Sequence, residues 1–244
     1  MNKKIVGIII ALVVLVAAVL GIVFLVSNDS LNNNENDSNK KLGTSIGKED
    51  NQIENENEKE NVADNTNGSD KKILIAYFSR ADENYEVGTV EVGNTEIMAG
   101  FIKDYLGDKA DTFKIDPVKA YPKSYKECTE VATEEQRNNA RPEFKNADSL
   151  NIDNYDTIFI GYPIWWGDVP MIINTFLEKY DFSGKTIIAF NTHEGSGNSG
   201  TYTKIKNKMS TATVNTNGLA IQGKTARQES SRSTVENWLK GLGY

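Results

Sequence analysis

Three short, uninterrupted apolar runs constrain the fold of this chain more than any other feature. Residues 73–78, 157–162 and 186–190 consist almost entirely of apolar side chains. Runs of about five or six such residues are typical of strands that are buried on both faces, as in a parallel sheet covered by helices. Residues 112–115 and 219–222 are weaker candidates for strands.

Helical patterns separate these runs. They occupy residues 95–106, 124–137, 171–177, 202–209 and 235–239. Because strands and helices alternate from residue 71 to residue 244, the sequence predicts an α/β fold with an open, doubly wound parallel sheet. Ligands of such sheets bind beyond the carboxyl ends of the strands. We therefore look for function in the loops after the three strong strands.

The first 26 residues predict a membrane anchor. Residues 5–26 carry no charged or polar side chain, and Lys3 and Lys4 precede them. A helix of this length spans about 33 Å, which is enough to cross the hydrocarbon core of a bilayer. We expect an uncleaved transmembrane helix, with a cleaved signal peptide as the alternative. The positive-inside rule predicts a single-pass protein of the cell membrane, with its N-terminus in the cytoplasm and its domain outside.

Residues 27–70 predict a disordered linker between this anchor and the domain of residues 71–244. They hold 12 Asn and 11 acidic residues but few apolar ones, so they cannot bury enough surface to offset their chain entropy. The linker alone has a net charge of −7, the value of the whole chain of 244 residues. The domain is close to neutral, which argues against a nucleic-acid partner. One Cys and one His leave no zinc cluster, so we predict no metal site.

The loop after the first strand carries a polar helix start. Ser79 and Arg80 follow the strand, and Gly93, Asn94 and Thr95 open the next helix. Backbone N–H groups at a helix start can hold phosphate oxygens. Asn94 and Thr95 are equally good structural N-caps, so this signal is weak by itself.

The second loop, residues 161–170, predicts an aromatic wall. Trp165 and Trp166 lie between glycine and proline residues that stiffen the turn. One of the two indoles can belong to the core, but both cannot easily point into it. The functional interpretation is a flat platform for a planar ligand ring.

The third loop, residues 191–200, is polar and rich in glycine, which lets backbone N–H groups approach a ligand. It has no nucleophile elbow, and His193 has no nearby nucleophile to activate. We therefore predict no catalytic residue. Cys128, in the helical pattern of residues 124–137, is interpreted as an ordinary, partly buried thiol.

Together and in this order, the three loops resemble the flavodoxin family. The resemblance is closest to a bacterial branch with Y-F-S-R before G-N-T, then G-Y-P-I-W-W-G, then T-H-E-G-S-G, and it covers nearly all of residues 71–244. It implies a five-stranded sheet of order 2-1-3-4-5 and FMN as the cofactor. The cofactor-binding residues that it implies are Ser79, Arg80, Asn94 and Thr95 at the phosphate, Tyr162, Pro163, Ile164, Trp165, Trp166 and Gly167 beside the isoalloxazine ring, and Thr192, His193, Glu194, Gly195 and Ser196 along its polar edge.

Residues 81–92 depart from the family pattern, which has a compact turn at this point. The insertion carries four acidic residues, Asp82, Glu83, Glu86 and Glu91, which would repel a phosphate if they faced it. We expect it to fold outward as a flap that leaves the site intact. Weakened FMN binding is the alternative. Asp168 and Glu194 are expected near the ring, where their charges would disfavour its reduced form.

Residues 218–225 match G-x-x-x-x-G-K-[ST], the phosphate loop of nucleotide triphosphatases. The context argues against that function, because residues 219–221 resemble a strand instead of a loop. Three hypotheses remain. The first is a membrane-tethered, flavodoxin-like electron carrier whose partner is an unidentified redox protein or a quinone. The second is an FMN-dependent NAD(P)H reductase of quinones or other small molecules, and the third is a flavin-free binding module on the same fold.

Overall fold

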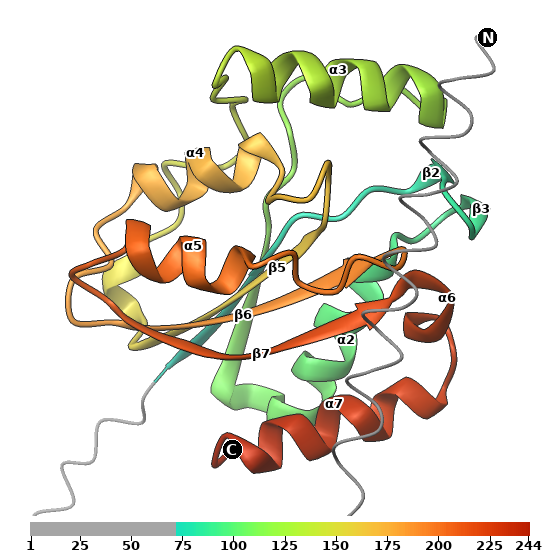
Figure 1. Cartoon of the computed structure of the whole chain (residues 1–244). Coiled ribbons are helices and arrows are strands. Elements are labelled where there is room, and N and C mark those ends of the chain that lie inside the picture. The colour runs from blue at the N-terminus through green and yellow to red at the C-terminus, as the bar shows by residue number, and fades with distance from the viewer. Residues whose placement is uncertain (1–71) are drawn as a thin grey trace, which may run out of the picture. The chain divides into compact units, whose positions relative to one another are not determined.

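A five-stranded parallel sheet organises the computed structural model, which describes residues 72–244 (Figure 1). The predicted anchor and linker lie outside the described residues. No helix within residues 72–244 is long and apolar enough to span a bilayer. The strands of the sheet are β1 (Ile73–Tyr77), β4 (Ala110–Lys114), β5 (Thr157–Pro163), β6 (Thr186–His193) and β7 (Thr213–Gln222).

The strand order is β4-β1-β5-β6-β7, and every neighbouring pair is parallel. Numbered along the chain within this sheet, the order is 2-1-3-4-5, which confirms the predicted topology. The switch in strand order falls between β1 and β5, where successive connections run to opposite sides of the sheet. The loops that follow these two strands are thereby separated and leave room for a ligand at the carboxyl edge.

Helices cover both faces of the sheet (Figure 1). On one face lie α2 (Asn94–Leu106), the short α6 (Gly223–Ala226) and α7 (Ser230–Gly241). On the other lie α4 (Met171–Lys179) and α5 (Thr201–Lys208). The remaining helix, α3 (Tyr125–Arg137), contacts α4 and the short strand β2. The single-turn 3₁₀ segments are Gly107–Lys109 and Ile152–Asn154.

Alternate residues of the central strands belong to two separate hydrophobic cores, one on each face of the sheet. Leu74 and Ile158 pack toward α4 and α5, whereas Ile75 and Phe159 pack toward α2 and α7. All four side chains are almost fully buried. Burial on both faces explains why these strands appear in the sequence as continuous apolar runs.

The edge strands differ most from the sequence-based expectation. β7 extends over Thr213–Gln222, whereas only residues 219–222 are predicted, because its first half is polar and largely exposed. Its pairing with β6 also shifts between Ile188 and Phe190. The antiparallel hairpin of β2 (Asp82–Asn84) and β3 (Gly88–Val90), within the acidic insertion, is not predicted at all.

Gly161 provides a test of the packing at the centre of the sheet. A Cβ at this position would overlap the Phe190 ring of the neighbouring strand. We expect Gly161→Ala to lower the free energy of unfolding by about 1–3 kcal/mol, because the aromatic ring has to leave its place. Urea unfolding followed by tryptophan fluorescence measures this change.

Gly100→Ala is the matched control, because Gly100 lies in α2 and a Cβ there meets nothing within 4 Å. Alanine stabilises an exposed helix position by up to about 1 kcal/mol relative to glycine. Equal effects of the two substitutions would contradict this account of the packing.

Candidate functional site

A cavity of about 170 Å³ lies at the carboxyl edge of the sheet, among the loops that follow β1, β5 and β6. All three loops that the sequence singles out contribute to it. The predicted site residues that line the cavity are Arg80, Asn94, Pro163, Ile164, Trp165, Trp166, Thr192, His193 and Glu194. The structure thus brings together segments that lie more than 100 residues apart in the chain.

Six further lining residues are missed by the sequence reasoning. They are Asn84, Tyr85, Tyr125, Cys128, Thr129 and Ala132. The first two belong to the hairpin and the other four to α3. The sequence does indicate which face of α3 is buried, because Cys128 and Ala132 are four residues apart and lie on the same side of the helix. No sequence pattern indicates that this face meets the second loop.

The start of α2 is built around Ser79. Its Oγ accepts a hydrogen bond from the N–H of Glu96 at 3.0 Å, so Ser79 caps the helix from a different segment. A Cβ on Gly93 would overlap Ser79 Oγ and the carbonyl oxygen of Arg80, so the close approach requires glycine. The N–H groups of Asn94 and Thr95, which begin the helix, have no acceptor within it.

Arg80 is engaged with the protein backbone. Its terminal nitrogens donate to the carbonyl oxygens of Glu83, Pro122 and Lys123, the last two at 2.6 Å. Its Nε is buried without a hydrogen-bond partner. Arg80 therefore joins the hairpin to the segment before α3, and both terminal nitrogens of its guanidinium are already engaged by carbonyl oxygens of the protein.

The acidic insertion forms part of the cavity wall. Glu83 accepts a hydrogen bond from the N–H of Tyr125 at 2.8 Å, and Glu86 pairs with Lys224 at 2.9 Å. Tyr85 stacks on Tyr125 with ring centroids 5.8 Å apart. The expectation of a flap folded outward is therefore corrected. The hairpin lies between α3 and α6, and contacts with the protein occupy two of its four carboxylates.

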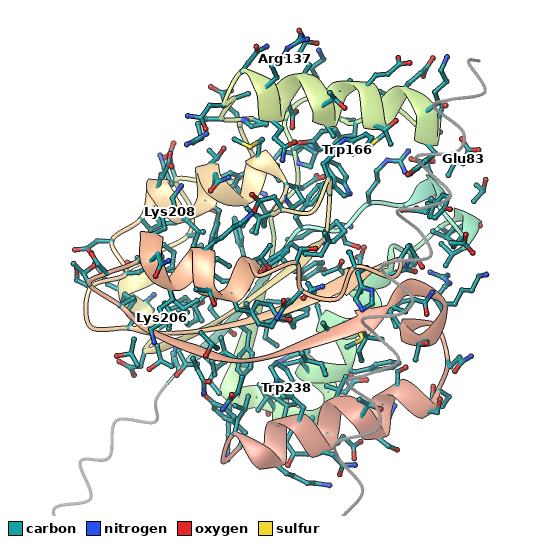
Figure 2. All side chains as sticks on the ribbon, in the orientation of Figure 1. Glu83, Arg137, Trp166, Lys206, Lys208 and Trp238 are labelled. Carbon is teal, nitrogen blue, oxygen red and sulfur yellow. The ribbon has the colours of Figure 1, made fainter. Side chains whose placement is uncertain are left out.

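The two tryptophans of the second loop diverge. Trp165 packs edge-on against Phe78 and Tyr121, with centroid distances of 5.2 and 5.0 Å. Trp166 is 60% exposed, and its indole N–H donates to the carbonyl oxygen of Thr129 at 3.3 Å (Figure 2). The reason is a tight turn in which Trp166 and Gly167 have φ of 49° and 70°, an unfavourable conformation for a tryptophan.

Four predicted residues of the second and third loops lie outside the lining. Tyr162 is fully buried in the core, where its hydroxyl donates to Thr201 Oγ1 at 2.9 Å. Gly167, Gly195 and Ser196 shape their turns without lining the cavity. Asp168 is also absent from the lining, and its charge is paired with Lys204 at 2.6 Å. The expected effect of Asp168 on a bound ring is not supported by this placement.

Thr192 connects the three loops. Its hydroxyl shares a hydrogen bond of 2.8 Å with Thr95 Oγ1, and both side chains are buried. Its carbonyl oxygen accepts from the N–H of Ile164 at 2.8 Å. Ser79 and Thr95 do not line the cavity themselves. They hold the first loop in place.

His193 and Glu194 form the polar side of the cavity. The Nδ1 of His193 accepts a hydrogen bond from the N–H of Gly195 at 3.0 Å, which places the proton of the neutral ring on Nε2. Burial lowers the pKa of His193 and raises the pKa of Glu194. Glu194 Oε2 is buried without a partner.

The triphosphatase motif has a different structure here. Residues 218–222 belong to β7, and α6 begins at Gly223 without an intervening loop. The lysine of the motif, Lys224, pairs with Glu86. Within residues 72–244, no cluster of three or more His, Cys, Asp or Glu side chains could hold a metal ion.

The family model of flavodoxin matches residues 72–242, and the chain therefore belongs to the flavodoxin family. No curated protein sequence matches it.

Several solved structures are similar to this chain. A flavoprotein from Bacteroides uniformis ATCC 8492 is 28% identical, with a TM-score of 0.54 over 70% of this chain and 98% of that chain. A flavoprotein from Bacteroides eggerthii DSM 20697 is 26% identical, with a TM-score of 0.52 over 71% and 98%. A flavoprotein from Lactobacillus acidophilus NCFM, in complex with FMN, is 19% identical, with a TM-score of 0.48 over 69% and 99%.

The titration of His193 tests the geometry of the third loop. Because the native pKa is lowered from the ordinary value of 6.5, the folded protein favours the neutral ring. The resulting contribution to stability is fully present above about pH 6.5 and is lost as the pH falls below it. The chain has one histidine, so a proton NMR titration reports this group alone. We expect a native pKa below 6.5 and a value near 6.5 in urea, whereas a native value at or above 6.5 would contradict the buried acceptor geometry.

Proposed function

We propose that this protein is a membrane-tethered flavodoxin that binds FMN in the cavity of residues 72–244 and transfers electrons through it. The observation that carries the proposal is the convergence of a helix start, an aromatic wall and two unpartnered polar atoms on one cavity. Each feature matches one part of FMN. The helix start matches the phosphate, the aromatic wall matches the planar ring, and the unpartnered polar atoms match the polar groups of the ring and of the chain that joins it to the phosphate. FMN is also the cofactor that the resemblance to the flavodoxin family implies, and the chain belongs to that family.

The first turn of α2 would hold the phosphate. Ser79 already occupies the N–H of Glu96, which leaves the N–H groups of Asn94 and Thr95 for phosphate oxygens. The helix dipole favours negative charge at this end. The contacts of Glu83 and Glu86 with Tyr125 and Lys224 reduce the repulsion that the insertion would otherwise exert.

The second loop would hold the ring. Ile164, Trp165 and Trp166 present apolar side chains to the cavity, while His193 lines it from the third loop. Bound FMN supplies a ring that takes up and releases electrons, and the protein sets how readily it does so. An apolar wall disfavours additional negative charge on a ring beside it.

The rim of the cavity suits exchange of electrons with a partner. Trp166 and Tyr85 both line the cavity and are 60% and 54% exposed, so aromatic side chains extend from its interior to the surface. A partner that contacts this rim comes within a short distance of the ring. We therefore favour electron transfer to a redox protein or a quinone at this rim.

The location rests on the sequence. The apolar residues 5–26 and the basic Lys3 and Lys4 support an anchor with the domain outside the cytoplasm. A flexible linker of 44 residues has a reach of about 35–40 Å, so the domain can meet a partner in or near the membrane.

FMN binding is the first test of the proposal. The purified full chain is expected to be yellow, with absorption near about 450 nm that returns when FMN is added to the stripped protein. Trp166→Ala should weaken FMN binding about tenfold, because it removes part of the aromatic wall. Trp238→Ala is the matched control, since Trp238 packs on the opposite face of the sheet, against Phe159. A chain that stays colourless with FMN present would sink the proposal.

The same preparation distinguishes a carrier from a reductase. With NADH or NADPH and a quinone, a carrier shows no steady turnover until a separate reductase is supplied. Sustained nucleotide oxidation by the chain alone would assign it to the reductases.

Topology is tested on intact cells. Added protease should remove the domain while the cell membrane remains sealed, because the charge pattern puts residues 27–244 outside. A cytoplasmic marker protein serves as the control for leakage. Protection of the domain until the cells are lysed would show that it lies inside.

A further inference from the structure

Two buried polar atoms lack a hydrogen-bond partner within residues 72–244, and both belong to residues that line the same cavity. They are Arg80 Nε, which donates, and Glu194 Oε2, which accepts. Buried polar groups in proteins are nearly always paired, so such an atom in a binding cavity indicates a group of the ligand. A carboxylate oxygen specifically requires a donor.

The position of Glu194 identifies the part of the cavity that it serves. A Cβ on Gly223 would overlap both Glu194 Oε1 and Asn94 Nδ2, so the carboxyl group and this amide lie side by side against α6. Asn94 is the first residue of α2, the helix start assigned to the phosphate. Glu194 is therefore placed beside the helix start that is assigned to the phosphate.

The surrounding charges do not satisfy this carboxylate. Lys224 is paired with Glu86 at 2.9 Å. Arg227 donates to the carbonyl oxygen of Val92 and to Asn94 Oδ1, at 2.8 and 3.1 Å. Burial raises the pKa of Glu194, although a side-chain hydrogen bond with Gln222 and the positive charge of Lys224 both act to lower it. These two neighbours therefore do not fully offset the cost of burying the carboxylate.

The chemistry of FMN then leaves one kind of partner. An ionised phosphate offers no donor, and the ring oxygens are acceptors. The donors are the ring N3–H and the hydroxyls of the ribityl chain that joins phosphate to ring. Because Glu194 adjoins Asn94 at the phosphate end, the hydroxyls are the donors within its reach.

We propose that the Glu194 carboxylate accepts a hydrogen bond from a ribityl hydroxyl of FMN, and so selects flavins that carry this chain. The inference rests on the proposed function. The family resemblance implies that Glu194 contacts the polar edge of the ring, whereas here Glu194 contacts the ribityl chain.

Riboflavin and lumiflavin test this assignment, because both are uncharged and both have the ring N3–H, but lumiflavin lacks the ribityl chain. Their affinities for the full chain are measured by quenching of flavin fluorescence. Glu194→Ala is expected to weaken riboflavin binding about tenfold or more, the range of a hydrogen bond to a charged group, and to change lumiflavin binding less than about twofold. Glu194→Gln, which keeps the shape and an acceptor oxygen, should fall between the wild type and Glu194→Ala. Glu91→Ala is the matched control, since Glu91 is exposed on the insertion and does not line the cavity.

Equal weakening of riboflavin and lumiflavin would overturn the assignment, since Glu194 would then act on the ring or on the fold. Unchanged riboflavin binding would overturn it as well. If lumiflavin binds too weakly to measure, FMN analogues that each lack one ribityl hydroxyl replace it. One analogue should bind Glu194→Ala and the wild type equally, and the absence of any such analogue would count against the inference. Failure of the proposed function is a separate result, because it appears as a wild-type chain that binds neither FMN nor riboflavin.

Discussion

The cavity depends on one buried contact, the hydrogen bond of 2.8 Å between the hydroxyls of Thr95 and Thr192. Thr192 lies next to the last residue of β6, and its carbonyl oxygen also accepts a hydrogen bond from the N–H of Ile164 in the second loop, while Thr95 is the second residue of α2. Three loops that are far apart in the chain are thereby held at one point on the sheet edge. In a parallel sheet the strands end at the same edge, so their loops are already neighbours. The hydroxyl pair fixes their spacing, and with it the distance between the helix start and the aromatic wall.

Around this point, the inserted hairpin makes contacts with Arg80, α3 and α6. Arg80 donates to the carbonyl oxygens of Glu83, Pro122 and Lys123 and so holds the hairpin against the segment before α3. The hairpin carries its acidic side chains toward partners on α3 and α6. Tyr85 and α3 thereby become part of the wall. The insertion adds Asn84 and Tyr85 to the lining of the cavity, and it provides one of the carbonyl oxygens that occupy Arg80.

Sequence reasoning located the strong strands, because strands buried on both faces leave continuous apolar runs, whereas the strand order was implied by the resemblance to the flavodoxin family. It located the three functional loops for the same reason, since each follows such a run. It was less successful at the edge strand β7, which is half polar, and at the separate hairpin of β2 and β3, whose strands are three residues each. Within the loops it could not tell lining residues from supporting ones. Tyr162 and Trp165 are both aromatic residues near the end of β5, yet the first is fully buried in the core and the second lines the cavity.

The sequence by itself determined the α/β class with a parallel sheet, the division of the chain into an apolar segment, an acidic segment and a domain, and the loops in which to look for a cofactor. These follow from local composition and periodicity, which are properties of neighbouring residues. Only the tertiary structure decided that Trp166 lines the cavity while most of its surface stays exposed, that the terminal nitrogens of Arg80 are occupied, and that Glu194 lies beside Asn94 with its Oε2 unpartnered among the described residues. The physical reason is that the direction and pairing of a side chain depend on what packs against it. At this site the neighbours come from α3, the hairpin and α6, which are separated from the three loops in sequence and meet them only in the fold.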